Sequence, residues 1–109
     1  MAKYKNRKTI IDEIMFDSKK EAEYYCELKL RKRAGDIKDF ELQPKFVLQK
    51  GFRKNGKAIR PITYMADFKV YHTDGTVEII DVKGFITKEF RIKQKLFDHQ
   101  YPELKLSIV

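Results

Sequence analysis

An apolar stripe with helical spacing runs through residues 19–34. Ser18 precedes it as a candidate N-cap, and Gly35 follows a basic last turn, as is common where helices end. The pattern predicts a helix over 19–34. Its inward face is expected to carry Ala22, Tyr25, Cys26, Leu28 and Leu30.

A second segment with helical spacing covers residues 88–101 and stops at Pro102. Lys88, Arg91 and Lys95 are expected to point outward. The inward face is expected to carry Phe90, Ile92, Leu96 and Phe97.

Segments that favour extended structure surround these helices. Asn55-Gly56 and Asp74-Gly75 are tight-turn signals, and the stretch from 9 to 16 predicts a short β-hairpin. The expected order is helix, three antiparallel strands, helix, strand (αβββαβ), an α/β sandwich with a mixed central sheet flanked by helices. The strands are expected at 44–49, 62–72, 77–83 and 104–109.

Length and composition fit one small folded domain, residues 1–109, with residues 1–8 as a flexible basic arm. Hydrophobic residues make up 42% of the chain, enough for a core. The single cysteine, Cys26, permits no internal disulfide and is expected to be a small core residue. No apolar run approaches the roughly 18 residues needed to cross a bilayer. We therefore expect a cytoplasmic protein.

The positive charge lies in the first half of the chain. The net charge is +8, and residues 1–60 hold 17 basic and 9 acidic side chains. This asymmetry favours a surface that binds a polyanion, most often nucleic acid. The segment from 50 to 60 contains five basic residues and no acid, which predicts a phosphate-contacting finger unless it is simply a solvated hairpin tip. These residues are Lys50, Arg53, Lys54, Lys57 and Arg60.

The candidate chemistry lies in the strand "EIIDVKG", residues 78–84. Asp81 and Lys83 are one residue apart, so they project from the same face. Pairing across the turn at Asp74-Gly75 brings Asp67 opposite Asp81 to within a residue of register. Two half-buried carboxylates repel, and a hard divalent cation such as Mg²⁺ would remove that conflict. Lys83 would then orient or deprotonate water, or offset phosphate charge, which indicates phosphodiester cleavage.

Several other polar residues allow two interpretations. Glu21 fits a capping box with Ser18, yet a first-turn carboxylate packed against the sheet can also reach the ion. Glu78 is expected on the opposite face from Asp81, facing solvent or at the sheet edge. His72 and His99 have no metal-ligand spacing and are expected at the surface.

Four segments in order resemble the PD-(D/E)XK nuclease superfamily, and more closely its small, phage-encoded, Holliday-junction-resolvase-like branch. The match spans nearly the whole chain. The segments are "FDSKKEAEYY" (16–25), "LQPKF" (42–46), "YMADFKVY" (64–71) and "EIIDVKG" (78–84).

The resemblance implies a restriction-endonuclease-like core in which Asp67 and Asp81 ligate Mg²⁺ or Mn²⁺. It also implies that Lys83 assists the water and that Glu21 completes the acidic set. Gln43 matches a polar position near the active site of related nucleases, although a hydrogen-bonding loop glutamine explains it equally well. The second helix commonly flanks the cleft in such nucleases, so at most one of Lys93 and Lys95 is expected to reach the site. Of the two, Lys93 is the candidate DNA-binding residue.

Two positions depart from the family pattern. Ala66 stands where many members have proline before the first acid, and Asp81 replaces the commoner glutamate. Asp81 retains the negative charge of the glutamate, so neither departure predicts an inactive enzyme.

The resulting hypothesis is a metal-dependent DNA endonuclease acting on branched DNA in phage recombination or replication, in the host cytoplasm. Symmetric cuts in a four-way junction imply a homodimer. One alternative is a general or transposase-type nuclease subunit that nicks duplex DNA. Another is a non-catalytic DNA-binding module that kept the fold.

Overall fold

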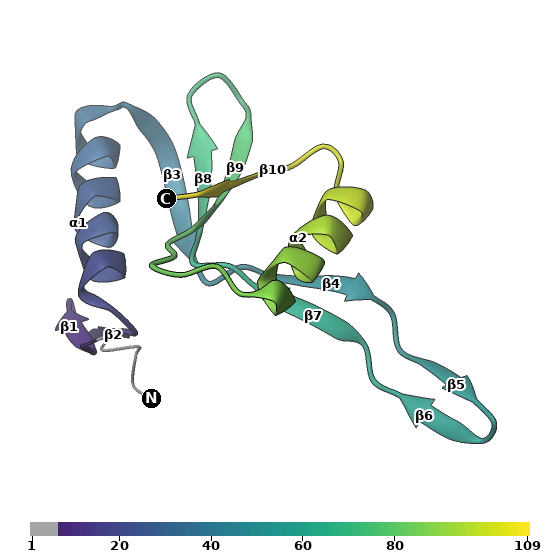
Figure 1. Ribbon diagram of the computed structural model, residues 1–109. Coiled ribbons are helices and arrows are strands. Elements are labelled where there is room, and N and C mark those ends of the chain that lie inside the picture. The colour runs from purple at the N-terminus through teal and green to yellow at the C-terminus, as the bar shows by residue number, and fades with distance from the viewer. Residues whose placement is uncertain (1–6) are drawn as a thin grey trace.

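A four-stranded mixed sheet lies between the two helices (Figure 1). The computed structural model describes residues 7–109, so the predicted arm at 1–8 lies, apart from its last two residues, outside the described residues. The strand order is β10–β9–β8–β3. β9 pairs in parallel with β10 and antiparallel with β8, and β8 pairs antiparallel with β3. The strands are β3 (Ile37–Leu42), β8 (Phe68–His72), β9 (Val77–Asp81) and β10 (Lys105–Ile108).

The helices cover opposite faces of this sheet. α1 (Lys19–Ala34) and α2 (Lys88–Gln100) each pack over their own hydrophobic core. Neighbouring residues of β9 serve the two cores, because Ile80 packs with α1 whereas Ile79 packs with α2. The chain is therefore a mixed α/β fold in which β9 is buried on both sides.

The first helix has the predicted boundaries. Ser18 Oγ accepts the N–H of Glu21, and Gly35 adopts a left-handed φ of 84° at the C-cap. The prediction that Leu30 faces inward is wrong, because 62% of this residue is exposed. It lies two positions from buried Leu28, which on a helix points it away from the core.

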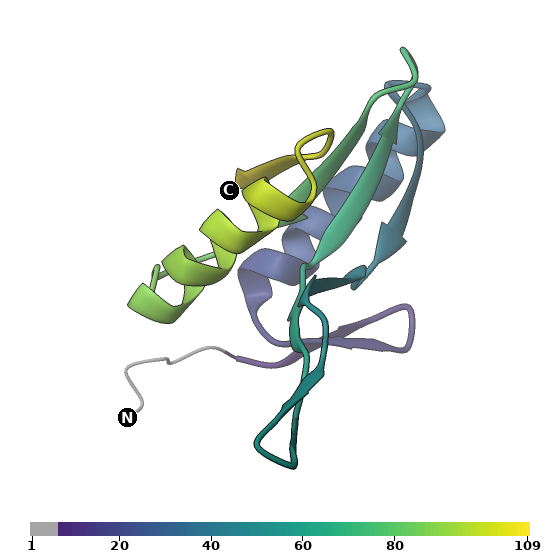
Figure 2. The same cartoon turned by 90° about the vertical axis from the view of Figure 1, so that its right-hand side faces the viewer.

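Three two-stranded ribbons lie outside the central sheet. β1 and β2 form the predicted N-terminal hairpin, and β4 pairs with β7. The β5–β6 hairpin continues the β4–β7 ribbon and projects away from both helices (Figures 1 and 2). The strands are β1 (Thr9–Ile11), β2 (Ile14–Phe16), β4 (Lys45–Gln49), β5 (Phe52–Lys54), β6 (Lys57–Ile59) and β7 (Ile62–Met65).

Two strand predictions need correction. The predicted strand at 62–72 breaks at Ala66–Asp67, so that β7 pairs with β4 outside the central sheet and β8 pairs inside it. Strand β3 was not expected at all. A register shift between Ile37 and Asp39 breaks its alternation, which hides the period-two pattern from the sequence.

The second helix and the last strand form where expected, with one error in the helix packing. Phe90 and Phe97 are buried, but 60% of Ile92 is exposed. Among residues 7–109, neither helix is both long and apolar enough to span a membrane.

Leu28 and Leu30 offer a matched test of this packing, since one is fully buried and the other exposed on the same helix. Leu28→Ala should lower the free energy of unfolding by about 2–5 kcal/mol, because it leaves a cavity in the core. Leu30→Ala should change it by less than about 0.5 kcal/mol. Urea denaturation followed by circular dichroism measures both. Equal losses would contradict the assigned helix orientation.

Candidate active site

Asp67 and Asp81 lie close together at the end of the β8–β9 pair. The last ladder partners are Phe68 and Ile80. The N–H of Asp67 also donates to the carbonyl of Ile80, at 3.1 Å, so the pairing becomes irregular at Asp67, just before β8. The two acids are therefore brought together to within a residue of the predicted register.

Asp81 is a buried carboxylate with two polar neighbours. Only 3% of the residue is exposed. The Tyr64 hydroxyl donates to its Oδ2, and the Lys83 ammonium lies 3.4 Å from its Oδ1. β9 ends at Asp81, two residues earlier than the predicted strand 77–83, so Lys83 lies just beyond the strand with its ammonium beside Asp81. These contacts hold the carboxylate in one orientation.

Asp67 is held by the backbone around it. Its Oδ2 accepts the N–H of Val82 at 2.7 Å, and its own carbonyl accepts the N–H of Gln43 at 2.9 Å. Gln43 has a left-handed φ of 51°, which is uncommon for a residue other than glycine. The turn after β3 is therefore hydrogen-bonded to the backbone of Asp67.

Glu21 approaches Asp67 from the α1 side. It is 7% exposed in the first turn of α1. With Gln43 and Asp67 it lines a cavity of about 100 Å³. Ser18 caps the Glu21 amide, so the capping interaction is present, while the carboxylate lies close enough to Asp81 and Lys83 for their charges to affect its pKa.

A larger pocket opens on the α2 side. It has a volume of about 390 Å³ and is lined partly by Tyr64, Lys83 and Lys93. The Lys83 ammonium lies 4.5 Å from the centre of the Phe90 ring, which limits its freedom. Lys93 lines this pocket while Lys95 is exposed, in agreement with the expectation that one of the two approaches the site. Asp67 and Asp81 therefore lie between a small cavity and an open pocket.

Burial and the negative charges nearby raise the pKa of Asp67 and of Glu21. Burial is the main cause that raises the pKa of Asp67 to about 7; the Val82 N–H opposes it, and the charges of Asp81 and Glu21 add to it. Burial likewise raises the pKa of Glu21, with contributions from Asp17 and Asp81. The site carries more negative charge than its surroundings stabilise.

The donor chemistry of this site fits a hard divalent cation. Within residues 7–109 no three Asp, Glu, His or Cys side chains are already placed to hold a metal ion. Mg²⁺, however, usually binds one or two carboxylates and takes its remaining ligands from water and substrate phosphate. Asp67 and Asp81 satisfy that requirement, and a cation would relieve the repulsion that raises the pKa of Asp67.

Two residues at this site were missed from the sequence. Tyr64 donates to Asp81 from β7, and the Lys20 ammonium donates to the carbonyl of Lys83 at 3.4 Å. Tyr64 follows the apolar alternation of its strand, so nothing local distinguishes it from a core tyrosine. Lys20 is one of several basic residues of α1, and its contact depends on tertiary packing.

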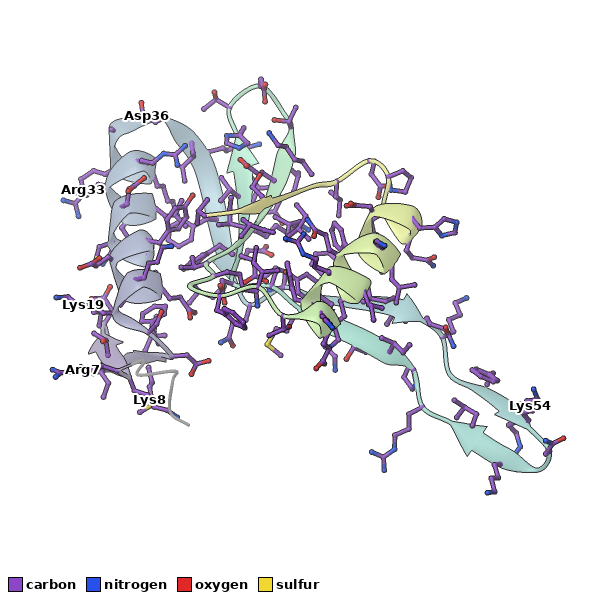
Figure 3. All side chains as sticks on the ribbon, viewed as in Figure 1. Arg7, Lys8, Lys19, Arg33, Asp36 and Lys54 are labelled. Atoms are coloured by element: carbon purple, nitrogen blue, oxygen red, sulfur yellow. The ribbon has the colours of Figure 1, made fainter. Side chains whose placement is uncertain are left out.

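The basic residues of the β5–β6 hairpin lie apart from the acids. Figure 3 shows Lys54 near the tip of the hairpin, far from Lys19 and Arg33 of α1. All eleven residues from 50 to 60, which comprise the hairpin and the residues beside it, are exposed. The site residues predicted there are Lys50, Arg53, Lys54, Lys57 and Arg60.

Three further expectations concern polar residues away from the acids. Glu78 is not simply solvent-facing, since it accepts from Ser107 Oγ and lies 2.8 Å from His72 Nε2. Its partners in the sheet explain why it and His72 are half-buried. His99 is exposed as expected, and Cys26 packs against the α1 core.

Comparison with known proteins gives one family. The family model described as "Protein of unknown function (DUF1064)" matches residues 1–109. No curated protein and no solved structure matches the chain.

The raised pKa of Asp67 predicts how stability depends on pH. The folded protein holds this proton more tightly than the unfolded chain, whose carboxyl has a pKa near 3.8. Stability without metal should therefore fall as pH rises from 4 to 7, between these two values. Asp67→Asn cannot ionise and should be more stable than the parent at pH 8 by about 1–2 kcal/mol, a figure reduced because the side chain is partly exposed.

Urea unfolding in EDTA between pH 4 and pH 8 measures this difference, and subtracting the two curves cancels the other titrating groups. Asp98→Asn, an exposed carboxylate on α2, is the control and should leave the slope unchanged. Parallel curves for Asp67→Asn and the parent would contradict the raised pKa.

Proposed function

The chain belongs to the DUF1064 family, and we propose that it is an endonuclease that uses Mg²⁺ or Mn²⁺ to hydrolyse phosphodiester bonds in branched DNA. One observation carries the proposal: Asp67 lies close to Asp81 at the end of the β8–β9 pair, with the Lys83 ammonium 3.4 Å from Asp81. Two acids that can hold a divalent cation, with a lysine beside them, are residue types suited to metal-assisted phosphodiester hydrolysis.

Each residue has a role in this proposal. Asp67 and Asp81 hold the cation, and Glu21 completes the acidic set from the α1 side. When bound, the ion would supply a Lewis acid at the phosphate and a more acidic bound water. Lys83 orients the attacking water and offsets charge on the phosphate, because Asp81 and Phe90 hold its ammonium at the pocket.

Two further residues position these groups. The Tyr64 hydroxyl fixes the orientation of Asp81, as hydrogen bonds to metal ligands commonly do. Gln43 lines the cavity beside Asp67 and Glu21, where its amide is available to water or substrate.

The basic surfaces supply DNA affinity. Lys93 lines the open pocket beside Lys83, where it would meet the phosphate backbone. The five basic residues of segment 50–60, three of them in the β5–β6 hairpin, would contact phosphates farther from the cleavage point. A binding module without catalysis has no use for buried acids close to a phosphate, because they repel it.

The wider proposals depend on the family resemblance. We infer that the mixed sheet between α1 and α2 is a restriction-endonuclease-like core, supported by the position of the acids at one end of the sheet. A homodimer follows from the need for two symmetric cuts in a four-way junction. A phage recombination or replication role in the host cytoplasm completes the proposal.

Cleavage of a labelled four-way junction, beside a linear duplex of the same sequence, tests the function. With Mg²⁺ or Mn²⁺, the protein should make paired symmetric nicks in the junction and none in EDTA. Asp81→Ala should lower the cleavage rate at least about 100-fold, since it removes a metal ligand, and should retain DNA affinity. Asp98→Ala, which removes an exposed carboxylate on α2, should cleave normally.

The substrates separate the alternatives. Equal cutting of junction and duplex would retain the site but reject the branched substrate, in favour of a nuclease that nicks duplex DNA. Absence of cutting with any metal, together with tight DNA binding, would reject the enzyme in favour of a binding module.

Tyr64→Phe tests the positioning of Asp81. Loss of the hydroxyl should weaken Mg²⁺ activation about tenfold or more, because Asp81 loses the bond that orients it. The rate at saturating Mg²⁺ should recover in part. A titration of cleavage rate against Mg²⁺ measures this, and an unchanged midpoint would show that Tyr64 does not position the ligand.

A further inference from the structure

The β5–β6 hairpin has two different faces. Phe52 pairs with Ile59 across the strands, and Lys54 pairs with Lys57 one step closer to the tip. Alternation places both pairs on one face, while Arg53 and Ala58 occupy the other. One face therefore presents an aromatic–aliphatic pair next to two ammonium groups.

The apolar pair is exposed although burial would be favourable. Phe52 is 45% exposed and Ile59 is 39% exposed. The hairpin projects from the molecule in both views, so neither residue belongs to a core cluster of the described chain (Figures 1 and 2). A cross-strand pair of this kind also stabilises the hairpin itself, a role that any test must separate from binding.

Charge decides which partner fits this face. Residues 50–60 carry five positive charges and no acid, and the whole chain has a net charge of +8. A second copy would repel this surface, whereas a nucleic acid would be attracted to it. Aromatic side chains stack on bases that are not already stacked in a duplex, and apolar wedges open base steps.

We propose that the face formed by Phe52, Ile59, Lys54 and Lys57 binds exposed base faces in DNA, where strands branch or are unpaired. Phe52 stacks on the exposed base with Ile59 beside it, and the two lysines hold the phosphates that follow. The inference rests on the proposed action on DNA and adds the part of the protein that recognises the branch. A linear duplex offers such bases only at its ends, so the hairpin would favour branched over continuous DNA.

Binding without cleavage tests this in the Asp67→Asn background with EDTA. Fluorescence anisotropy gives the Kd for a four-way junction, a long blunt-ended linear duplex and a single strand of the same sequence. Phe52→Val keeps strand propensity but removes the ring. It should weaken junction and single-strand binding about tenfold and leave duplex binding within about twofold.

Two controls separate stacking from other effects. Lys54→Gln with Lys57→Gln should weaken binding to all three DNAs by similar factors and reduce the salt slope by about 2. Leu30→Ala removes an exposed apolar residue from α1 and should leave every Kd unchanged. A 2-aminopurine placed beside the branch should change fluorescence on binding, and Phe52→Val should abolish that change.

Each contrary result has a distinct meaning. Equal loss on all three DNAs, or none on the junction, would overturn the inference while DNA binding stands. A change from dimer to monomer on Phe52→Val, measured by sedimentation without DNA, would overturn it in favour of a contact between copies. Absence of DNA binding by the parent protein would reject the proposed function, and this inference with it.

Discussion

The site depends on one antiparallel pairing, that of β8 with β9. It brings Asp67, just before β8, close to Asp81 at the end of β9, so two acids fourteen residues apart in sequence come together. A one-residue slip would move one of them to the other face. The register is fixed by the cores on both sides, because Ile79 and Ile80 are each buried against a different helix. The packing of these two isoleucines thus determines where the acidic side chains lie.

The acids lie between two different environments. On the α1 side, Glu21 and Gln43 close a small cavity beside Asp67. On the α2 side, Tyr64 orients Asp81, and Lys83 borders an open pocket. The open side would admit a phosphate.

Local patterns sufficed for part of this arrangement. The capping residues predicted the ends of α1, and the turn at Asp74-Gly75 was enough to place Asp67 near Asp81 to within a residue of register. Strand β3 was missed because its bulge disrupts alternation. The break at Ala66–Asp67 was missed because the apolar pattern continues through it. In the sequence, Tyr64 cannot be told apart from another buried tyrosine, because its hydrogen-bond partner, Asp81, is seventeen residues away.

The β5–β6 hairpin is joined to the rest of the protein only through the β4–β7 ribbon, and its Asn55-Gly56 turn has the positive φ angles of a two-residue loop. The hairpin could therefore be lengthened without a change in the central sheet. One extra residue in each strand would add about 3.4 Å of reach but exchange the faces that the tip presents. Two extra residues in each strand would add about 7 Å and keep those faces. Insertions of four residues are thus the smallest change that lengthens the hairpin without altering what it presents.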